Sequence, residues 1–137
     1  MPGIQPSFYV ASRASNLDRP RMWARVRAEH GYHFTSTWVD IALAGTVPDL
    51  ADLWTDIAAE IAACDCLVLY VAPEDFPLKG ALVEVGMALA LSKAVRVVAE
   101  GVDLDPVDCK PLGSWARHPL VAFASTVDEA LAGFCRR

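Results

Sequence analysis

The sequence predicts a single doubly wound α/β domain, spanning residues 1–137, with a five-stranded parallel sheet. Strand-like apolar runs alternate with helix-like segments along the whole chain, which is the pattern of right-handed crossovers between parallel strands. One run, Cys66–Ala72, is apolar at every position, as expected for a central strand that is covered on both faces. A chain of 137 residues that is 54% hydrophobic is long enough to bury one sizeable core.

The other four strands are short runs bounded by polar or turn-forming residues. They are expected at Ser7–Ala11, His33–Trp38, Ala94–Ala99 and Pro119–Ala124. The second of these is rich in threonine and aromatic residues, which favour a half-buried strand. We find no internal repeat or linker in the sequence, and the order of elements is that of a Rossmann-like or flavodoxin-like domain.

Four helices follow from the remaining periodicity. The first is expected between the capping residue Asp18 and the stop at Gly31. The second, Leu50–Ile61, has apolar residues at helical spacing along one continuous stripe. The third, Gly80–Ser92, is apolar on nearly all sides, and the last follows the capping box Thr126–Glu129.

Composition and charge exclude several classes of protein. The net charge of −5 argues against a nucleic-acid partner, because a phosphate backbone is bound by clustered Lys and Arg. No apolar run reaches the roughly 20 residues that span a bilayer. Residues 1–6 lack the basic and apolar regions of a secretion signal, so we expect a cytoplasmic protein with no membrane partner.

Common cofactor and metal motifs are missing from the sequence. There is no G-x-G-x-x-G after the first strand and no P-loop pattern. The sequence therefore lacks the main motifs that would indicate a dinucleotide-binding or triphosphate-binding site. The histidines at 30, 33 and 118 and the cysteines at 64, 66, 109 and 135 lack metal-ligand spacing. We therefore expect no metal site, and we interpret the cysteines as small apolar core residues.

Glu84 is the residue that stands out for chemistry. It is the only charged side chain in the stretch Gly80–Leu91, which is apolar enough to be buried on most sides. It also lies near the start of the helix, where the helix dipole favours negative charge. An ionised carboxylate shielded from water suits nucleophilic attack on a sugar carbon. The alternative is a solvated glutamate that forms an ion pair with Lys79 or Arg13.

Four segments carry a resemblance to a known family. They are Phe8–Ser12, Thr35–Trp38, Ile61–Asp65 and Gly80–Ala90, in the same order along nearly the whole chain. The most specific is the pattern Gly-x-x-x-Glu-x-Gly-x-Ala, which begins at Gly80 and is followed by a strand. Together they resemble the nucleoside 2-deoxyribosyltransferase superfamily, which includes deoxynucleoside 5′-monophosphate N-glycosidases and short bacterial and phage homologues.

The resemblance implies an enzyme of nucleotide metabolism, a transferase or hydrolase. It would cleave or exchange the N-glycosidic bond of a 2′-deoxyribonucleoside or its 5′-monophosphate, with that small molecule as its partner. Glu84 matches the family's nucleophile, which forms a covalent glycosyl-enzyme at C1′ that water or a second base resolves. Tyr9 matches a tyrosine that orients this carboxylate, and Asp56 is the candidate for protonating or binding the base. No cofactor is implied, because base expulsion needs only a nucleophile and a proton.

Further residues are expected to bind the substrate. Ser12 and Arg13 would meet the 5′ end of the sugar, Lys79 and Gly80 would lie at a phosphate, Trp38 would stack on the base, and Asp40 would make a polar contact with it. A homo-oligomer, a dimer or larger, is implied, because in the family a neighbouring subunit completes each site. Plain structural interpretations stay open, with Tyr9 as a strand aromatic, Arg13 as a surface charge and Trp38 as a core residue.

Two departures from the family pattern leave other functions open. The aspartate that the family places eight residues before Asp65 falls on Ile57 here, with Asp56 one residue away. The family's Asp or Ser six residues before the nucleophile is replaced by Leu78. The alternative is therefore a catalytically inactive nucleotide-binding sensor or effector of the same fold. A third interpretation is a structural or partner-binding module.

Overall fold

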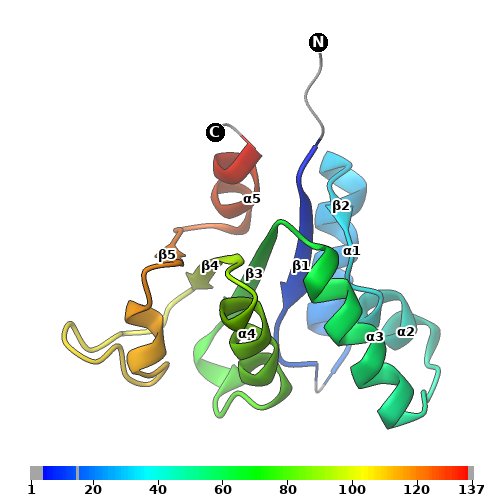
Figure 1. Cartoon of the computed structure of the whole chain (residues 1–137), viewed down its shortest axis with the longest axis horizontal. Coiled ribbons are helices and arrows are strands. Elements are labelled where there is room, and N and C mark those ends of the chain that lie inside the picture. The colour runs from blue at the N-terminus through cyan, green and yellow to red at the C-terminus, as the bar shows by residue number, and fades with distance from the viewer. Residues whose placement is uncertain (1–4, 15, 136–137) are drawn as a thin grey trace.

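A five-stranded parallel sheet forms the centre of the molecule (Figure 1). The computed structural model describes residues 5–14 and 16–135, so residues 1–4 of the N-terminal segment discussed above lie outside it. The strands are β1 (Ser7–Ala11), β2 (His33–Phe34), β3 (Cys66–Val71), β4 (Ala94–Ala99) and β5 (Val121–Phe123). Their order is β2-β1-β3-β4-β5, and every neighbouring pair is parallel. The predicted α/β fold is confirmed.

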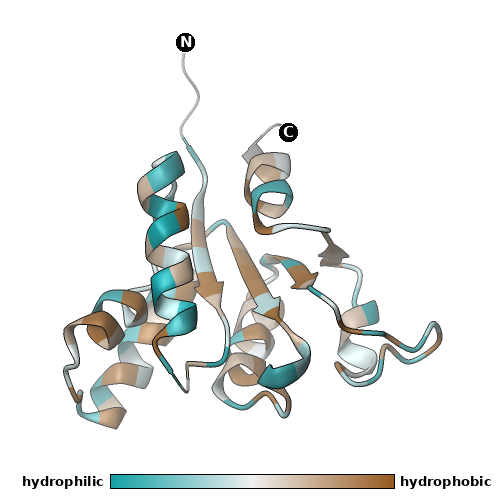
Figure 2. Cartoon of the chain, turned by 180° about the vertical axis from the view of Figure 1, so that it is seen from behind, coloured by the Kyte–Doolittle hydropathy of each residue, from teal (hydrophilic) through white to brown (hydrophobic). Residues whose placement is uncertain are grey.

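Helices cover both faces of this sheet. α3 (Leu50–Ala63) and α4 (Gly80–Ala90) lie on the face towards the viewer in Figure 1. α1 (Asp18–His30) and α5 (Val127–Cys135) lie on the opposite face, which Figure 2 shows, and α2 (Trp38–Ala44) packs against α1. Within the part of the chain that the structure describes, no helix has both the length and the apolar character of a membrane span.

The alternation of side chains along the strands divides the core between these two faces. Tyr9 of β1 belongs to the cluster beneath α3 and α4, whereas Phe8 and Val10 belong to the cluster beneath α1 and α5. All six residues of β3 are buried, as predicted for a strand covered on both faces. Cys64, Cys66 and Cys109 are also buried, and the side chain of Cys135 lies outside the described part.

The chain changes direction across the sheet between β1 and β3. It runs outward from β1 to β2, returns to β3 beside β1, and continues to β4 and β5 on the other side. The carboxyl ends of β1 and β3 therefore meet the beginnings of the following helices at a topological switch point. This is the lower edge of the sheet in Figure 1, and ligands of open parallel sheets bind at such an edge.

The second strand is shorter than the sequence predicts. β2 ends at Phe34, and the N–H of Thr35 still donates to the carbonyl oxygen of Phe8 at 2.8 Å. From Ser36 onward, side chains contact β1 in place of a strand ladder. The N–H of Val10 donates to Ser36 Oγ at 3.2 Å, and Nε1 of Trp38 donates to the carbonyl oxygen of Val10 at 2.7 Å. These two side chains form the hydrogen bonds that the N–H and carbonyl oxygen of Val10 require. The main chain can therefore enter α2 at Trp38, a helix that the sequence did not predict. β5 is likewise shorter than expected.

Candidate active site

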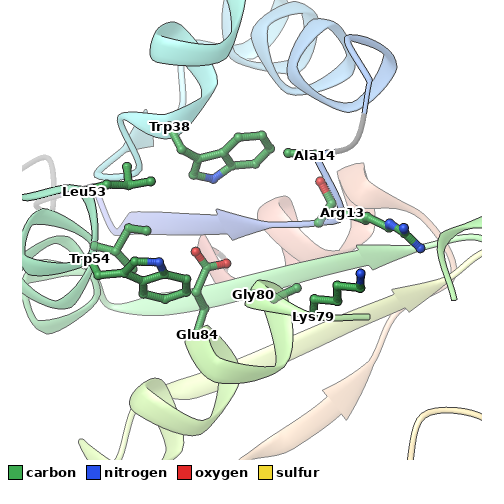
Figure 3. A pocket seen from close by; sticks show the side chains of 11 residues that line it. Arg13, Ala14, Trp38, Leu53, Trp54, Lys79, Gly80 and Glu84 are labelled. Carbon is green, nitrogen blue, oxygen red and sulfur yellow. The ribbon is translucent and has the colours of Figure 1, made fainter. Parts of the chain in front are cut away.

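A cavity of about 430 Å³ opens at the switch point. The loop after β1, the starts of α2 and α4, and the first two turns of α3 supply its walls (Figure 3). The lining residues are Ser12, Arg13, Ala14, Trp38, Leu53, Trp54, Ile57, Lys79, Gly80, Ala81 and Glu84. The fold therefore brings together most of the residues that the sequence analysis assigned to the site.

The carboxylate of Glu84 is held by one oxygen and open at the other. Its side chain extends from α4 beneath the cavity and is only 7% exposed. The hydroxyl of Tyr9, on β1, donates to Glu84 Oε2 at 2.6 Å. Within the described residues, every fully buried side-chain oxygen or nitrogen has a hydrogen-bond partner, whereas Oε1 has none. Oε1 is therefore accessible from the cavity.

The electrostatics of this pair follow from its burial. Burial raises the pKa of Glu84 to about 7 from an ordinary 4.5, the Tyr9 hydrogen bond lowers it, and the charge of Glu60 raises it further. Burial and the Glu84 carboxylate also raise the pKa of Tyr9, so its phenol stays protonated and remains a donor. No ion pair joins Glu84 to Arg13 or Lys79 within the described chain. The interpretation of Glu84 as a solvated, ion-paired glutamate is therefore wrong.

The two sides of the cavity differ in character. In Figure 3, Trp54 lies beside Glu84 and Trp38 lies above it, whereas Arg13 and Lys79 lie on the side of Glu84 opposite Trp54. The indole of Trp38 is fixed by its hydrogen bond to β1. Ser12 is buried at the end of β1, where its hydroxyl accepts a hydrogen bond from the indole of a core tryptophan at 3.0 Å. The two indoles therefore lie near the carboxylate, and the two cations line the other part of the cavity.

The indole of Trp54 lies close to the main chain of Gly80. A Cβ on Gly80 would lie 3.4 Å from Cζ2 of Trp54, at the short limit of ordinary van der Waals contact. The indole therefore packs directly against the first residue of α4. This contact joins α3 to α4 at the cavity wall, beside the residue that precedes Glu84 by one helical turn.

Two residues assigned to the site lie outside the cavity. Asp40 is exposed on α2, and its carboxylate accepts hydrogen bonds from Arg27 at 2.7 and 3.1 Å, which hold the pKa of Asp40 below its usual range. Asp56 is exposed on α3 and does not line the cavity, whereas its neighbour Ile57 does. The position where the family places its aspartate thus faces the cavity, but it carries an aliphatic side chain.

Sequence reasoning missed the contribution of α3. Leu53, Trp54 and Ile57 belong to the apolar stripe that predicted this helix, and the stripe was interpreted as core. The last turns of the stripe are indeed buried, but the first turns reach the switch point and face the cavity. Trp54 could have indicated this contribution, because it is a large aromatic residue near the start of a helix that faces this edge of the sheet. No group of three or more metal-ligating side chains gathers anywhere in the described residues.

The chain has the fold of two enzymes of solved structure. A 2-desoxiribosyltransferase from Leishmania mexicana matches it with a TM-score of 0.70 and 18% sequence identity, over 96% of this chain and 98% of that chain. A CMP N-glycosidase from Clostridium botulinum matches it with a TM-score of 0.54 and 12% identity, over 96% and 99% of the two chains. No family model and no curated protein matches the sequence. The chain therefore has the fold of these two enzymes.

Proposed function

We propose that this chain cleaves or exchanges the N-glycosidic bond of a 2′-deoxyribonucleoside or of its 5′-monophosphate, with Glu84 as the nucleophile. The observation that carries the proposal is the buried Glu84 carboxylate, which Tyr9 holds through Oε2 and which reaches the cavity through Oε1. The two enzymes of the same fold support it, since one is a deoxyribosyltransferase and the other an N-glycosidase that acts on CMP.

The reaction has two steps at the same carbon. Oε1 of Glu84 attacks C1′, the C1′–N bond breaks, and its electron pair leaves with the base nitrogen, which takes up a proton. The oxygen of water, or a nitrogen of a second base, then attacks C1′ and loses its proton to solvent, and Glu84 departs as a carboxylate. Water as the acceptor gives a hydrolase, and a second base gives a transferase.

Tyr9 acts as a positioning residue in this scheme. Its hydrogen bond to Oε2 fixes the orientation of the carboxylate and leaves Oε1 to react. Because the pKa of the phenol is raised, Tyr9 remains a donor while Glu84 is ionised. The same donor favours the charged form of Glu84, which is the nucleophilic form.

The rest of the cavity accommodates the two parts of the substrate. Trp38 and Trp54 offer flat apolar surfaces for a base, and Ser12, Arg13, Lys79 and Gly80 line the side that would hold the sugar and its 5′ group. Glu84 is the only carboxyl group among the described lining residues. The base would therefore take its proton from water in the open cavity, and Asp56, next to Ile57 of the wall, is the other candidate donor.

The second candidate function is a nucleotide sensor or effector without turnover. The observation that favours it is that Glu84 is the only carboxyl group among the described residues that line the cavity. Asp40 is bound by Arg27, and Asp56 is exposed outside the cavity. Such a protein would bind a nucleotide in the cavity and gain thermal stability from it without releasing the base.

A base-release assay tests the proposal. Each deoxynucleoside and each 5′-monophosphate is incubated with the protein, with and without a second base, and free base is measured by chromatography. We expect release by the wild type and none by Glu84→Gln. Glu129→Gln, which neutralises an exposed glutamate on α5, is the matched control and should retain activity. Thermal stabilisation by a nucleotide without release of base from any substrate would favour the sensor.

We also propose a homo-oligomer that assembles through the outer side of α4. Val83 of α4 and Leu91, which directly follows this helix, are 51% and 50% exposed. Leu82 lines two apolar hollows, of about 360 and 200 Å³. A second copy that covered these surfaces would remove apolar area from water. Sedimentation at micromolar concentration should find a dimer or larger species, and Val83→Asp should weaken it, whereas a monomeric wild type would contradict the proposal.

A further inference from the structure

Glu60, near the end of α3, is bonded to the segment of chain that leads into α2. Resting on the function proposed above, we propose that Glu60 is a positioning residue of the candidate active site, which holds Trp38 in the cavity wall through its hydrogen bonds to Thr37. Glu60 is not among the described residues that line the cavity, so it would act on a substrate only through other side chains.

The hydrogen bonds of Glu60 are directed at one short segment. Its carboxylate accepts from the N–H of Thr37 at 3.1 Å and from the hydroxyl of Thr37 at 2.6 Å, each with a different oxygen. Its main-chain carbonyl oxygen accepts from the hydroxyl of Thr35 at 3.0 Å. No Lys, Arg or His forms an ion pair with Glu60 in the described part of the chain. The carboxylate therefore binds Thr37 and no described cation.

Thr37 is the residue from which α2 starts, and Trp38 is the first residue of that helix. A threonine at this position usually accepts a hydrogen bond from the first turn of its own helix. Here the hydroxyl donates to Glu60, and the structure shows no such capping bond among the described residues. Because α2 has only seven residues, it has little stability of its own, and its position depends on contacts with other elements.

Two sets of contacts therefore fix Trp38. Its indole donates to the carbonyl oxygen of Val10 at 2.7 Å, which ties the side chain to β1. The bonds between Glu60 and Thr37 hold the main chain one residue earlier, which ties the start of α2 to α3. Without the second set, the start of α2 would be free to move and the indole would lose its fixed place above Glu84 (Figure 3).

The charge of Glu60 also acts on the proposed nucleophile. Burial is the main cause that raises the pKa of Glu84 and of Tyr9, and the charge of Glu60 raises both further. Removal of this charge alone should therefore favour the ionised form of Glu84. The other titratable groups near this pair are Cys64, which acts on Tyr9, and the cavity residues Arg13 and Lys79, which are not among the groups that shift the pKa of Glu84.

Two substitutions separate the hydrogen bonds of Glu60 from its charge. The amide of Glu60→Gln can accept from the N–H of Thr37 and donate to its hydroxyl oxygen, so KM for base release should stay at the wild-type value. The midpoint of the pH–rate profile should move to lower pH. Glu60→Leu loses the bonds as well as the charge. Its midpoint should move in the same direction, and its KM should rise by up to about tenfold, as expected for the loss of one aromatic contact.

Thr37→Val and Glu129→Gln complete the set of variants. Thr37→Val removes the hydroxyl that donates to Glu60 and keeps the charge, so KM should rise while the midpoint stays in place. Because Thr37 is exposed, this variant provides the same test should Glu60→Leu fail to fold. Glu129→Gln, which neutralises an exposed glutamate on α5, is the matched control and should change neither quantity.

Hydrogen exchange of the Trp38 indole measures the positioning without turnover. Its N–H is bonded to Val10, so exchange should be slow in the wild type. NMR on the full chain, with Trp38→Phe to assign the signal, should find exchange at least about tenfold faster in Glu60→Leu and close to the wild-type rate in Glu60→Gln.

The two measurements distinguish failure of this proposal from failure of the proposed function. An indole exchange rate that is unchanged in Glu60→Leu and in Thr37→Val would overturn the positioning role. Base release with the same KM in every variant would also overturn it and would leave the proposed function standing. Faster exchange in Glu60→Leu that Glu60→Gln restores, with no release of base by the wild type, would support the positioning role and overturn the proposed function.

Discussion

The hydroxyl of Tyr9 lies 2.6 Å from Oε2 of Glu84, although 75 positions separate the two residues along the chain. Tyr9 belongs to β1 and Glu84 to α4, so the bond forms only when this helix packs on the sheet. It lowers the pKa of Glu84, whereas burial and the charge of Glu60 raise it, and the result is a value of about 7. The packing of α4 on β1 therefore governs the charge of the proposed nucleophile near neutral pH.

The first prediction concerns the pH dependence of base release. The wild-type kcat/KM should rise with pH around a midpoint near 7, because only ionised Glu84 attacks. Tyr9→Phe removes the hydrogen bond that lowers this pKa, so the midpoint should move to higher pH, and the maximal rate should fall about tenfold or more as orientation is lost. A pH–rate profile from about pH 5 to about pH 9 measures both effects.

Tyr70→Phe, which removes a phenol on the other face of the sheet, is the control and should leave the midpoint of the profile unchanged. An unmoved midpoint in Tyr9→Phe would count against the positioning role.

The second prediction concerns stability. Burial raises the pKa of Glu84 from 4.5 to about 7, so between these values the folded state keeps a proton that the unfolded state has lost. The free energy of unfolding of the wild type should therefore fall as pH rises through this range, by about 3 kcal/mol from this group. Glu84→Gln cannot ionise and should not lose this stability.

Chemical denaturation at two pH values measures this difference. The stability of Glu84→Gln relative to the wild type should grow by about 2 kcal/mol between about pH 5 and about pH 8. Glu129→Gln, on an exposed surface, should show no comparable change. A relative stability that stays constant with pH would mean that the carboxylate is better solvated than its burial indicates.

The third prediction concerns the wall between α3 and α4. Gly80→Ala places a methyl group 3.4 Å from the Trp54 ring, at the short limit of van der Waals contact, so it fills the space beside the indole at the cavity wall. We expect KM to rise several-fold and kcat to change less, because Glu84 and Tyr9 do not move. Steady-state kinetics and the fluorescence of the indole provide the measurements. Gly133→Ala, where the added methyl group meets nothing within 4 Å, should change neither constant.

The fourth prediction separates the two sources of the proton that the base requires. If Asp56 supplies it, Asp56→Asn should lower kcat by about 10²-fold to 10⁴-fold. If water in the open cavity supplies it, kcat should stay close to that of the wild type. We expect the second result, because Asp56 is exposed and does not line the cavity. Asp52→Asn, on an exposed position of the same helix, is the control for loss of charge alone.

The layers of the fold and the position of the nucleophile candidate can be predicted from the sequence alone. Both are local properties of the chain. Unbroken apolarity marks β3 because a strand covered on two faces has no solvated side, and Glu84 stands out because an apolar helix rarely buries a lone charge. The order of strands and helices then places the carboxyl ends of β1 and β3 at one edge.

The side chains that surround Glu84 depend on packing between elements that are distant in the sequence. Trp38 leaves the predicted strand because its indole and Ser36 satisfy the polar groups of β1, which local periodicity does not encode. Asp40 binds Arg27 of another helix, which removes it from the cavity. Trp54 belongs to an apolar stripe that predicts a buried helix face, but it lines a cavity because the first turns of α3 reach the switch point. A pattern along the chain specifies which face of an element is apolar, whereas packing between distant elements specifies whether that face meets protein or open space.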